Sequence, residues 1–575
     1  MSITRTADAS PLAADAVAGI TDATLASIVA DHWEYLMWWA PTFATTLGDH
    51  RYDDRLARRD AVSRAEARDQ RDQLITRLVA LDPATLGSTD RDTHQLLRDQ
   101  LEASRGSDLI RSDEWTVDAY TASPLAELSY LVESHGVTSE SDARNLLARI
   151  AQGDALIDDT IANLRCGLAE GLVAAAEKVR RAVAQLDAEL AKPRETWSLV
   201  TPAWAAAYPA IATELHAIVD RQIAPALVRL RDFYRDVILP RARGELEGLS
   251  GLPDADARYR AAIIVHVGLA LAPAELHALG HAEIARTDRE LAELGARVLG
   301  TTDLASTIAK LRSDPTLYFA TREQILEAAQ TALDRAKAAI PRFFSVLPKT
   351  DCIMRETPAY EAPYSTVAYY RQPHYDGSKP GEYFVNTYKP ETRARFEMEA
   401  LTWHESIPGH HLQIAIAQEL GALPAFRKLD GSTSYVEGWA LYTERLADEM
   451  GLYTSDLDRL GKLSFDAWRA SRLVVDTGLH SRGWSRDQAE AFMREHTALT
   501  EINISNEVDR YIGWPGQALA YKVGQIEIVR LRALAEQQLG ATFAIKGFHE
   551  VVLGAGAVTL PVLANRVQAW IRDQS

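Results

Sequence analysis

A histidine–glutamate pair followed closely by two more histidines has the composition of a zinc site. The stretch TWHESIPGHHLQ contains His404, Glu405, His410 and His411. Zinc peptidases typically carry H-E-x-x-H on one helix, where imidazoles at i and i+4 share a face and the glutamate beside the first acts as base. These residue types predict hydrolysis assisted by Zn2+, with Glu405 accepting a proton from a water molecule.

The position of the second histidine departs from the usual motif. The residue four places after His404 is Pro408, which has no ligating atom. At about 100° per residue, His410 would lie about 240° round a regular helix from His404, and His411 about 20° round but two turns along. Proline removes an amide donor and glycine permits unusual dihedrals, so a bulge at Pro408-Gly409 could return His410 to His404. We predict His410 as the second ligand, with His411 as the alternative.

A carboxylate further along the chain is expected to complete the metal site. The helical pattern SYVEGWALYTE places Glu437 near its start and Glu444 seven residues later on the same face. Glu437 follows His410 by 27 residues, which leaves room for the rest of one helix, a connection and a return. We predict Glu437 as the third ligand, and Glu444 as a residue that orients a ligating histidine.

A second histidine pair could offer a rival metal site. His277 and His281 occur at i, i+4 spacing in HALGH. However, Ala278 stands where a catalytic glutamate would follow the first histidine, and Gly280 weakens the helix between them. We interpret this pair as ordinary surface or core histidines.

The elements that would position these residues are almost all helices. Amphipathic or well-punctuated helical patterns occur at residues 21–39, 64–81, 92–105, 142–187, 204–238, 273–299 and 321–339, and again from 392 to the end. Between them, residues 365–370 and 382–388 have strand character around the turn sequence DGSKPG. The prediction is a mainly α protein with a small antiparallel sheet near the active helix. We expect one helical domain over residues 16–575, made of a helical part at 16–346 and a catalytic part at 347–575.

Charge and composition exclude several classes of partner. The formal charge is −18 and no basic cluster offsets it, so nucleic acid and anionic membranes are not expected partners. Two cysteines in 575 residues make no disulfide framework. The N-terminus lacks a basic start followed by an apolar run, and no apolar stretch could cross a bilayer, so a cytoplasmic location is expected. Residues 1–15 are expected to form a flexible tail.

Five passages together resemble the bacterial domain-of-unknown-function 885 family. They are FVNTY (384–388), HESIPGHHLQ (404–413), EGWALYTE (437–444), RLVVDTGLH (472–480) and PGQALAYKVGQIEI (515–528). That family is similar to the thermostable (Taq-type) carboxypeptidases and to other helical gluzincin-like metallopeptidases. The resemblance implies a nearly all-helical body with a deep cleft, a small sheet at its rim, bound zinc and peptide-bond hydrolysis.

The same resemblance implies further roles around the cleft. The strand at 384–388, with Asn386, would pair with an extended substrate. A hydroxyl or imidazole would stabilise the oxyanion, and the candidates are Tyr511, Tyr521 and His480. A cation would hold a substrate carboxylate, and the candidates are Arg371 and Arg510.

Together, these features predict a zinc metallocarboxypeptidase that acts on short peptides. The alternatives within enzymes are a zinc endopeptidase or dipeptidase and an amidase. From another class, the chain could be an inactive peptidase-like protein that only binds. The sequence does not indicate an oligomeric state.

Overall fold

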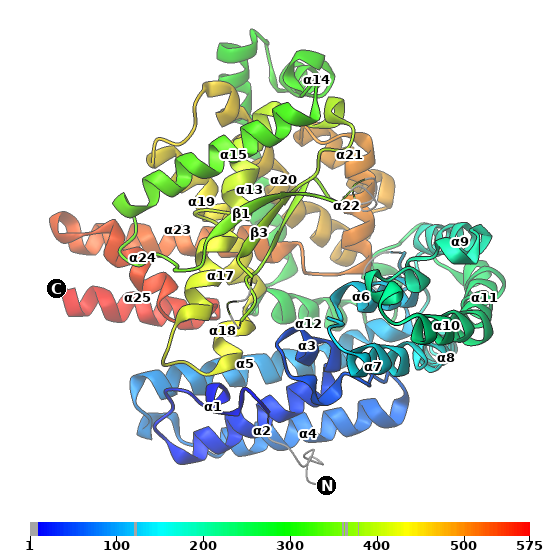
Figure 1. Cartoon of the computed structure of the whole chain (residues 1–575). Helices are drawn as coiled ribbons and strands as arrows, with labels where there is room; N and C mark the ends of the chain where they lie inside the picture. Colours follow the sequence, from blue (N-terminus) through cyan, green and yellow to red (C-terminus); the bar gives the residue numbers. More distant parts are fainter. Residues whose placement is uncertain are drawn as a thin grey trace. The chain divides into compact units, whose positions relative to one another are not determined.

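The computed structural model describes residues 10–119, 123–358, 362, 366–375, 377 and 379–574, and it is mainly helical, as the sequence predicts (Figure 1). Its described residues fall into two compact units: unit one takes Met1–Asp90 and Ser104–Arg258, and unit two takes Arg91–Ala103 and Tyr259–Ser575. The predicted boundaries at residues 15 and 346 mark changes in sequence character and stay predictions, as does the deep cleft.

Unit one is built from amphipathic helices. The helix α2 begins after Asp22, whose carboxylate accepts a hydrogen bond from the Leu25 amide, and its apolar side is buried through Trp33 and Met37. The helices that lie in this unit are α1 (Ala13–Ala16), α2 (Ala23–Trp39), α3 (Pro41–Thr46), α4 (Ala61–Val79), α6 (Pro124–Ser134), α7 (Glu140–Ile150), α8 (Gly153–Ala169), α9 (Ala176–Ala191), α10 (Pro209–Ile218) and α11 (Ala224–Phe233). Two more, α5 (Ser88–Ile110) and α12 (Ala255–Val267), have residues in both units.

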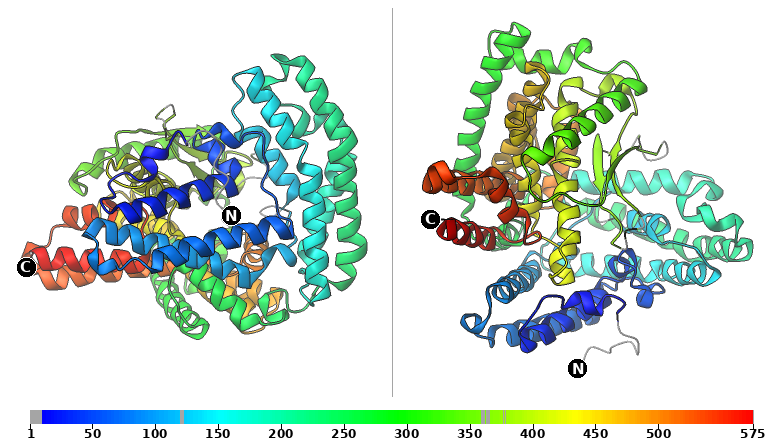
Figure 2. Two further views of the ribbon diagram at one scale, coloured as in Figure 1. Left: turned by 90° about the horizontal axis from the view of Figure 1, so that it is seen from below. Right: turned by 60° about the vertical axis from the view of Figure 1, so that its left-hand side comes forward.

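The predicted helical stretch at 142–187 is divided into α7, α8 and α9. Within unit one, α8, α9 and α11 lie side by side, which the left view of Figure 2 shows in cyan and green. Their shared core contains Leu156, Val179 and Leu227. Burial of this apolar face stabilises the layer of helices.

Unit two contains every residue predicted for the site. Its helices are α13 (Pro273–Leu299), α14 (Leu304–Ser313), α15 (Arg322–Ala339), α16 (Met398–Glu405), α17 (His410–Glu419), α18 (Ala425–Leu429), α19 (Thr433–Glu449), α20 (Asp456–Ser481), α21 (Arg486–His496), α22 (Glu501–Gly513), α23 (Leu519–Leu539), α24 (Ile545–Leu553) and α25 (Leu560–Gln574). Two long helix pairs, α13 with α20 and α19 with α23, form its framework. The predicted helix at 273–299 is confirmed, and Gly300 ends it in the left-handed conformation.

The sheet of unit two is mixed, which corrects the predicted antiparallel sheet. Its strands β1 (Cys352–Glu356), β2 (Ala368–Arg371) and β3 (Gly381–Val385) lie in the order β1-β3-β2, with β1 parallel and β2 antiparallel to β3. The sequence pattern showed β2 and β3 but not β1, which joins the other edge of β3 from outside the predicted hairpin. Figure 1 shows the strands beside α15 and α17.

The central place of β3 changes the predicted substrate contact. Both of its edges are occupied along Gly381–Val385, so a peptide cannot add as a strand to this part of the predicted 384–388 segment. An added strand would have to pair at β2 or β1. Ser365 of the predicted first strand, and Asp376 and Ser378 of the predicted turn, lie outside the described residues.

Residues 1–9 of the predicted N-terminal tail lie outside the described residues, whereas residue 10 is part of the core of unit one. Ser10 is buried, and its hydroxyl donates a hydrogen bond to Asp49 at 2.8 Å. Among the described helices, none combines the length and the apolarity needed to cross a bilayer.

Close contact between α19 and α23 depends on two glycines. A Cβ added to Gly438 would lie 2.4 Å from the carbonyl carbon of Gly524, so Gly438→Ala must force the helices apart. We expect this substitution to lower the free energy of unfolding by about 2–3 kcal/mol in a denaturant titration. The matched control is Gly421→Ala, whose added Cβ meets nothing within 4 Å and should cost less than about 0.5 kcal/mol. Equal stability of the two variants would contradict the packing argument.

Candidate metal centre

The two predicted histidine ligands lie on different helices. The helix α16 ends at Glu405, Ser406 leaves helical geometry with φ −110° and ψ −106°, and α17 begins at His410. Gly409 makes this turn possible, because a Cβ there would lie 2.0 Å from the carbonyl oxygen of His404. The sequence predicted a bulge within one helix; the structure has a complete break that reorients the chain.

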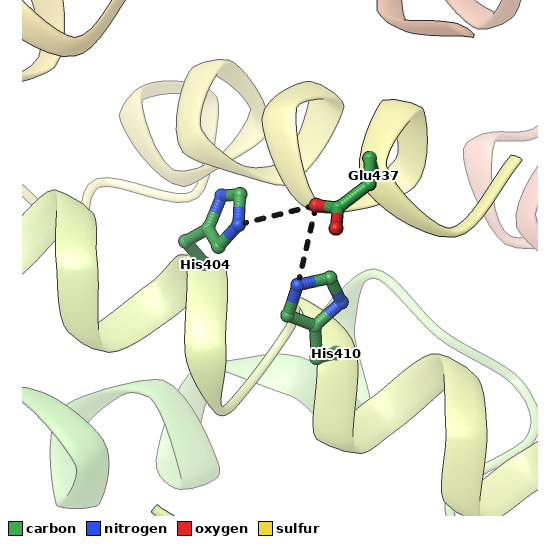
Figure 3. A group of neighbouring side chains, drawn as sticks. All are labelled: His404, His410 and Glu437. Atoms are coloured by element: carbon green, nitrogen blue, oxygen red, sulfur yellow. Dashed lines mark ion pairs between the residues drawn. The ribbon is translucent and has the colours of Figure 1, made fainter. Parts of the chain in front are cut away.

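The break brings His404 and His410 to the same carboxylate. The Nε2 atom of His404 lies 3.7 Å from Oε2 of Glu437, and Nε2 of His410 lies 3.6 Å from the same oxygen. The two imidazole rings are 4.8 Å apart and nearly perpendicular. Figure 3 shows the oxygen of Glu437 between them, with α19 supplying the carboxylate.

The donor atoms of this group fit a zinc ion. Oε2 of Glu437, which faces the Nε2 atoms of both histidines, is buried without a hydrogen-bond partner. Nδ1 of His404 lies 2.8 Å from a carboxylate oxygen of Glu444, which favours a proton on Nδ1. The other ring nitrogen, Nε2, then has a lone pair, and it faces Oε2 of Glu437. Ligand atoms about 2 Å from a tetrahedral zinc are about 3.3 Å apart, close to the 3.7 and 3.6 Å between Glu437 and the two imidazole nitrogens. Two imidazoles and one carboxylate form the ligand set of a zinc site that keeps an open position.

Burial also sets the histidines in the protonation state that metal binding requires. It moves the pKa of His404 well below its usual value, with His410 and Arg469 adding to the effect. The pKa of His410 is lowered as well, by burial, although Glu437 opposes the shift. Both imidazoles are therefore neutral near pH 7 and can ligate a cation without first losing a proton.

Glu444 orients one of the two histidines. Its Oε1 atom lies 2.8 Å from Nδ1 of His404, and its side chain is almost fully buried. Burial raises the pKa of Glu444 to about 7, a shift that the charge of Arg469 opposes. A carboxylate on the far nitrogen of a ligating histidine fixes the ring and its tautomer. The sequence predicted that Glu444 orients a ligating histidine without saying which one, and the structure places it against His404.

His411, the alternative second ligand, faces the sheet. Its Nδ1 atom lies 2.9 Å from the hydroxyl of Tyr370, and its Nε2 atom lies 3.1 Å from the carbonyl oxygen of Thr350. One residue along a helix turns a side chain by about 100°, which separates it from His410. Both ring nitrogens are engaged there, and the ligand role of either histidine stays a prediction.

Glu405 lies next to the metal centre but outside the group of three. It is half-buried, and the backbone of Tyr370 in β2 lies near enough to its carboxylate to oppose the rise in its pKa. Burial raises the pKa of Glu405 to about 8, and the charges of Glu437 and Glu444 add to the shift. The carboxylate is thus held with a high proton affinity beside a candidate metal site, which suits proton transfer.

The three predicted oxyanion donors have different surroundings. The hydroxyl of Tyr511 donates to Glu507 at 2.6 Å, and Nε2 of His480 lies 3.0 Å from the backbone oxygen of Tyr511. Tyr521 is half-buried, and burial raises its pKa, with the charge of Glu437 as the next largest cause. The charge of Glu437 thus reaches Tyr521, whereas Tyr511 and His480 belong to a hydrogen-bonded cluster.

The predicted substrate-binding residues have partners of other kinds. The amide of Asn386 donates to the backbone oxygens of Ala362 and Thr366, at 2.8 and 2.9 Å. The exposed guanidinium of Arg371 lies over the Phe384 ring, 4.8 Å from its centre. The side chain of Arg510 donates twice to Glu507 and once to Gln517. Their roles in substrate binding stay predictions.

Three residues near the centre were not predicted from the sequence. Trp439 donates from its indole nitrogen to the carbonyl oxygen of Pro408 at 3.0 Å and so supports the link between α16 and α17. Arg469 and Arg472 are buried on α20. The signal for the arginines was present, because they stand one turn apart in a helical stretch that is otherwise largely apolar.

The rival histidine pair has no third ligand in the part of the chain that the structure describes. The Nδ1 atom of His277 lies 2.7 Å from the hydroxyl of Thr477, and its Nε2 atom lies 3.1 Å from Nε2 of His281. These contacts join α13 to α20. The pair therefore serves as a polar contact inside a helix–helix interface.

Comparisons with other proteins give a family and two similar folds. The family model described as "Bacterial protein of unknown function (DUF885)" matches residues 41–567. The crystal structure of the "putative lipoprotein" from Colwellia psychrerythraea superposes with a TM-score of 0.88 and 25% identity, over 96% of this chain and 99% of that one. A "putative lipoprotein of unknown function" from Shewanella oneidensis gives 0.73 and 19%, over 94% and 98%. No curated protein matches this chain.

Proposed function

This chain belongs to the DUF885 family of bacterial proteins, and we propose that it hydrolyses peptide bonds with zinc held by His404, His410 and Glu437. The observation that supports the proposal most is the buried oxygen of Glu437, which lacks a hydrogen-bond partner and faces two imidazole nitrogens. The HESIPGHHLQ and EGWALYTE passages resemble the DUF885 family, and the expected similarity of that family to helical zinc peptidases is in keeping with the proposal.

Glu405 is the proposed general base. Its carboxylate would accept a proton from water as the water oxygen bonds to the peptide carbonyl carbon, and would then pass that proton to the amide nitrogen as the C–N bond breaks. The products are a carboxylic acid and an amine, so atoms balance without another reactant. Zinc, when bound, would supply a Lewis acid that lowers the pKa of water and polarises the carbonyl. The pKa of Glu405 would fall on cation binding, because the opposite charge favours its ionised form.

Tyr521 is the favoured donor to the oxyanion. The charge of Glu437 is among the causes that raise the pKa of Tyr521, whereas it is not among those for Tyr511, whose hydroxyl is already bonded to Glu507. A phenol hydroxyl in a site with little water can stabilise a developing negative charge strongly.

The substrate backbone would pair with β2. This strand lies at an edge of the sheet in the order β1-β3-β2, and the backbone of its residue Tyr370 lies near the carboxylate of Glu405. An extended peptide that joins this edge would bring its scissile bond past the general base. The expected partner is a short peptide, and the expected type of enzyme is a carboxypeptidase. The cytoplasmic location expected from the N-terminal residues stays a prediction.

The proposed function is tested by digestion of a defined peptide library. Full-length protein loaded with one equivalent of zinc is incubated with the library, and the products are identified by mass spectrometry. We expect residues to be lost from C-termini, and activity to disappear on chelation and return on adding zinc. If protein shown to contain one zinc per chain leaves every peptide intact, the proposal is wrong. Internal cleavage would support hydrolysis but exclude the carboxypeptidase type.

A further inference from the structure

Two buried arginines beside the metal centre have nitrogen atoms without partners. Arg469 and Arg472 lie one turn apart on α20, and their side chains are only 5% and 4% exposed. Nε and Nη1 of Arg469 and Nη1 of Arg472 are buried without a hydrogen-bond acceptor. A buried donor that lacks an acceptor destabilises the folded chain. Several such atoms in one place indicate that something else supplies the acceptors.

Aromatic rings hold both guanidinium groups in place. Arg472 lies over the rings of Trp468 and Tyr521, at 4.6 and 4.2 Å from their centres. Arg469 lies 4.3 Å from the ring centre of Trp468 and 4.4 Å from that of Phe465. Stacking of this kind fixes the planes of the guanidinium groups without using their N–H donors.

The neighbouring side chains accept hydrogen bonds from only some of the N–H groups of each arginine. Nη2 of Arg472 donates to Glu507 at 3.1 Å, and its Nε atom donates to the hydroxyl of Tyr511 at 3.2 Å. Within the described chain, Arg469 forms one ion pair, with Oε1 of Glu444 at 3.7 Å, and that distance is longer than a hydrogen bond.

The arginine pair adjoins the metal ligands through shared contacts. The Oε1 atom of Glu444 that lies near Arg469 is the same atom that contacts Nδ1 of His404 at 2.8 Å. On the other side, Arg472 stacks on Tyr521, the proposed oxyanion donor. An anion bound by this pair would therefore lie close to the bond that is hydrolysed.

We propose that Arg469 and Arg472 form the subsite for the free C-terminal carboxylate of a peptide substrate. This inference rests on the proposed function and gives its substrate class: peptides with an unblocked C-terminus. A carboxylate offers two oxygens to the unpartnered donors of two fixed guanidinium groups. The two arginines suggested by the sequence fit this task less well. All three side-chain nitrogens of Arg510 already donate to Glu507 or Gln517, and Arg371 is exposed.

The test measures binding, which does not require turnover. The probe is a mixture of N-acetylated tripeptides with varied C-terminal residues, prepared as free acids and as C-terminal amides. Two proteins are used: wild type without zinc, and the Glu405→Gln variant loaded with zinc. After ultrafiltration, mass spectrometry measures how much of each peptide the protein retains. We expect free acids to be retained about 30-fold better than amides, because leaving a buried charge unpaired costs about 2 kcal/mol or more.

Substitution assigns the preference to the arginine pair. Arg472→Met and Arg469→Met should each reduce the preference for free acids to less than about threefold. Arg395→Met, at an exposed arginine that belongs to none of the proposed sites, is the matched control and should retain it. Arg371→Met tests the alternative cation suggested by the sequence. Because a buried substitution can impair folding, Arg472→Lys is tested as well: it keeps the charge but not the planar fork, and should retain an intermediate preference. Circular dichroism and the thermal midpoint establish that each variant is folded.

The outcomes separate this inference from the proposed function. Equal retention of acids and amides by both wild-type and Glu405→Gln protein would overturn the subsite, even if peptides are cleaved. Loss of the preference in Arg371→Met but not in folded Arg472→Met or Arg472→Lys would overturn it too. Retention of free acids through the arginine pair without any hydrolysis by zinc-loaded wild type would keep the subsite and reject the peptidase.

Discussion

Replacing Glu405 with glutamine is expected to lower kcat for peptide hydrolysis by about 10²–10⁴-fold while the protein keeps one zinc per chain. The carboxylate of Glu405 lies outside the group formed by His404, His410 and Glu437, so it is not needed to hold the ion. Glutamine has nearly the same shape but cannot accept and release the proton. The measurements are kcat on a peptide identified by the library digest and zinc content by elemental analysis.

The matched control for this prediction is Glu391→Gln. Glu391 is exposed, and the same chemical change there should leave both kcat and zinc content at the wild-type values. If Glu405→Gln kept wild-type turnover, the assignment of the general base would be wrong. If it lost zinc, Glu405 would have to be counted among the ligands.

His410→Asn is expected to weaken zinc binding by more than about 100-fold, whereas His411→Asn should still bind one zinc per chain. Losing a direct ligand should exceed the 10–100-fold loss typical of residues that only orient ligands. His411 instead bonds to the hydroxyl of Tyr370 and the backbone oxygen of Thr350. Its replacement should lower the free energy of unfolding by about 1–3 kcal/mol without removing the metal.

Two readouts keep these effects apart. Zinc affinity is measured by competition with a chelating dye, and stability by thermal unfolding with and without zinc. Zinc at about 1,000 times its dissociation constant adds about 4 kcal/mol to the stability of a protein that binds it only when folded. That increment should be present in His411→Asn and strongly reduced in His410→Asn. The reverse pattern would transfer the ligand role to His411.

The sequence predicted the helices with strong local punctuation and the residue types of the metal centre. The helix at 273–299 is one case, since proline near its start and Gly300 after its end are local signals. His404, Glu405 and Glu437 could be chosen from the sequence as candidate site residues. Helix packing alone does not require a histidine followed by a glutamate, with another glutamate further along the chain. For these features, the information lies within a few residues of the position itself.

Features that depend on distant contacts could not be predicted in the same way. The strand β1 is short and pairs with β3 across a long connection, so its five residues carry no decisive pattern. The break after Glu405 was anticipated as a bulge, because Pro408 and Gly409 permit several backbone paths and only packing selects one. The spacing of Arg469 and Arg472 is visible in the sequence, but the donor atoms that they leave without acceptors appear only when α20 is placed against its neighbours.

The division of the two proposed histidine ligands between α16 and α17 affects how relatives of this candidate centre can be recognised. In H-E-x-x-H the pitch of one helix dictates the interval between histidines, so the interval is the same wherever the motif occurs. Here the interval is set by the four-residue link from Ser406 to Gly409. A related protein could have a link of another length, provided that the link still brings the second histidine back to the first. A profile that demands a fixed interval would discard such chains. A more tolerant signature is H-E, a short link with proline and glycine, a histidine, and a glutamate about one helical hairpin later. By the same logic, transplanting this centre into a designed scaffold would require two helix ends and the turn between them rather than a single helix.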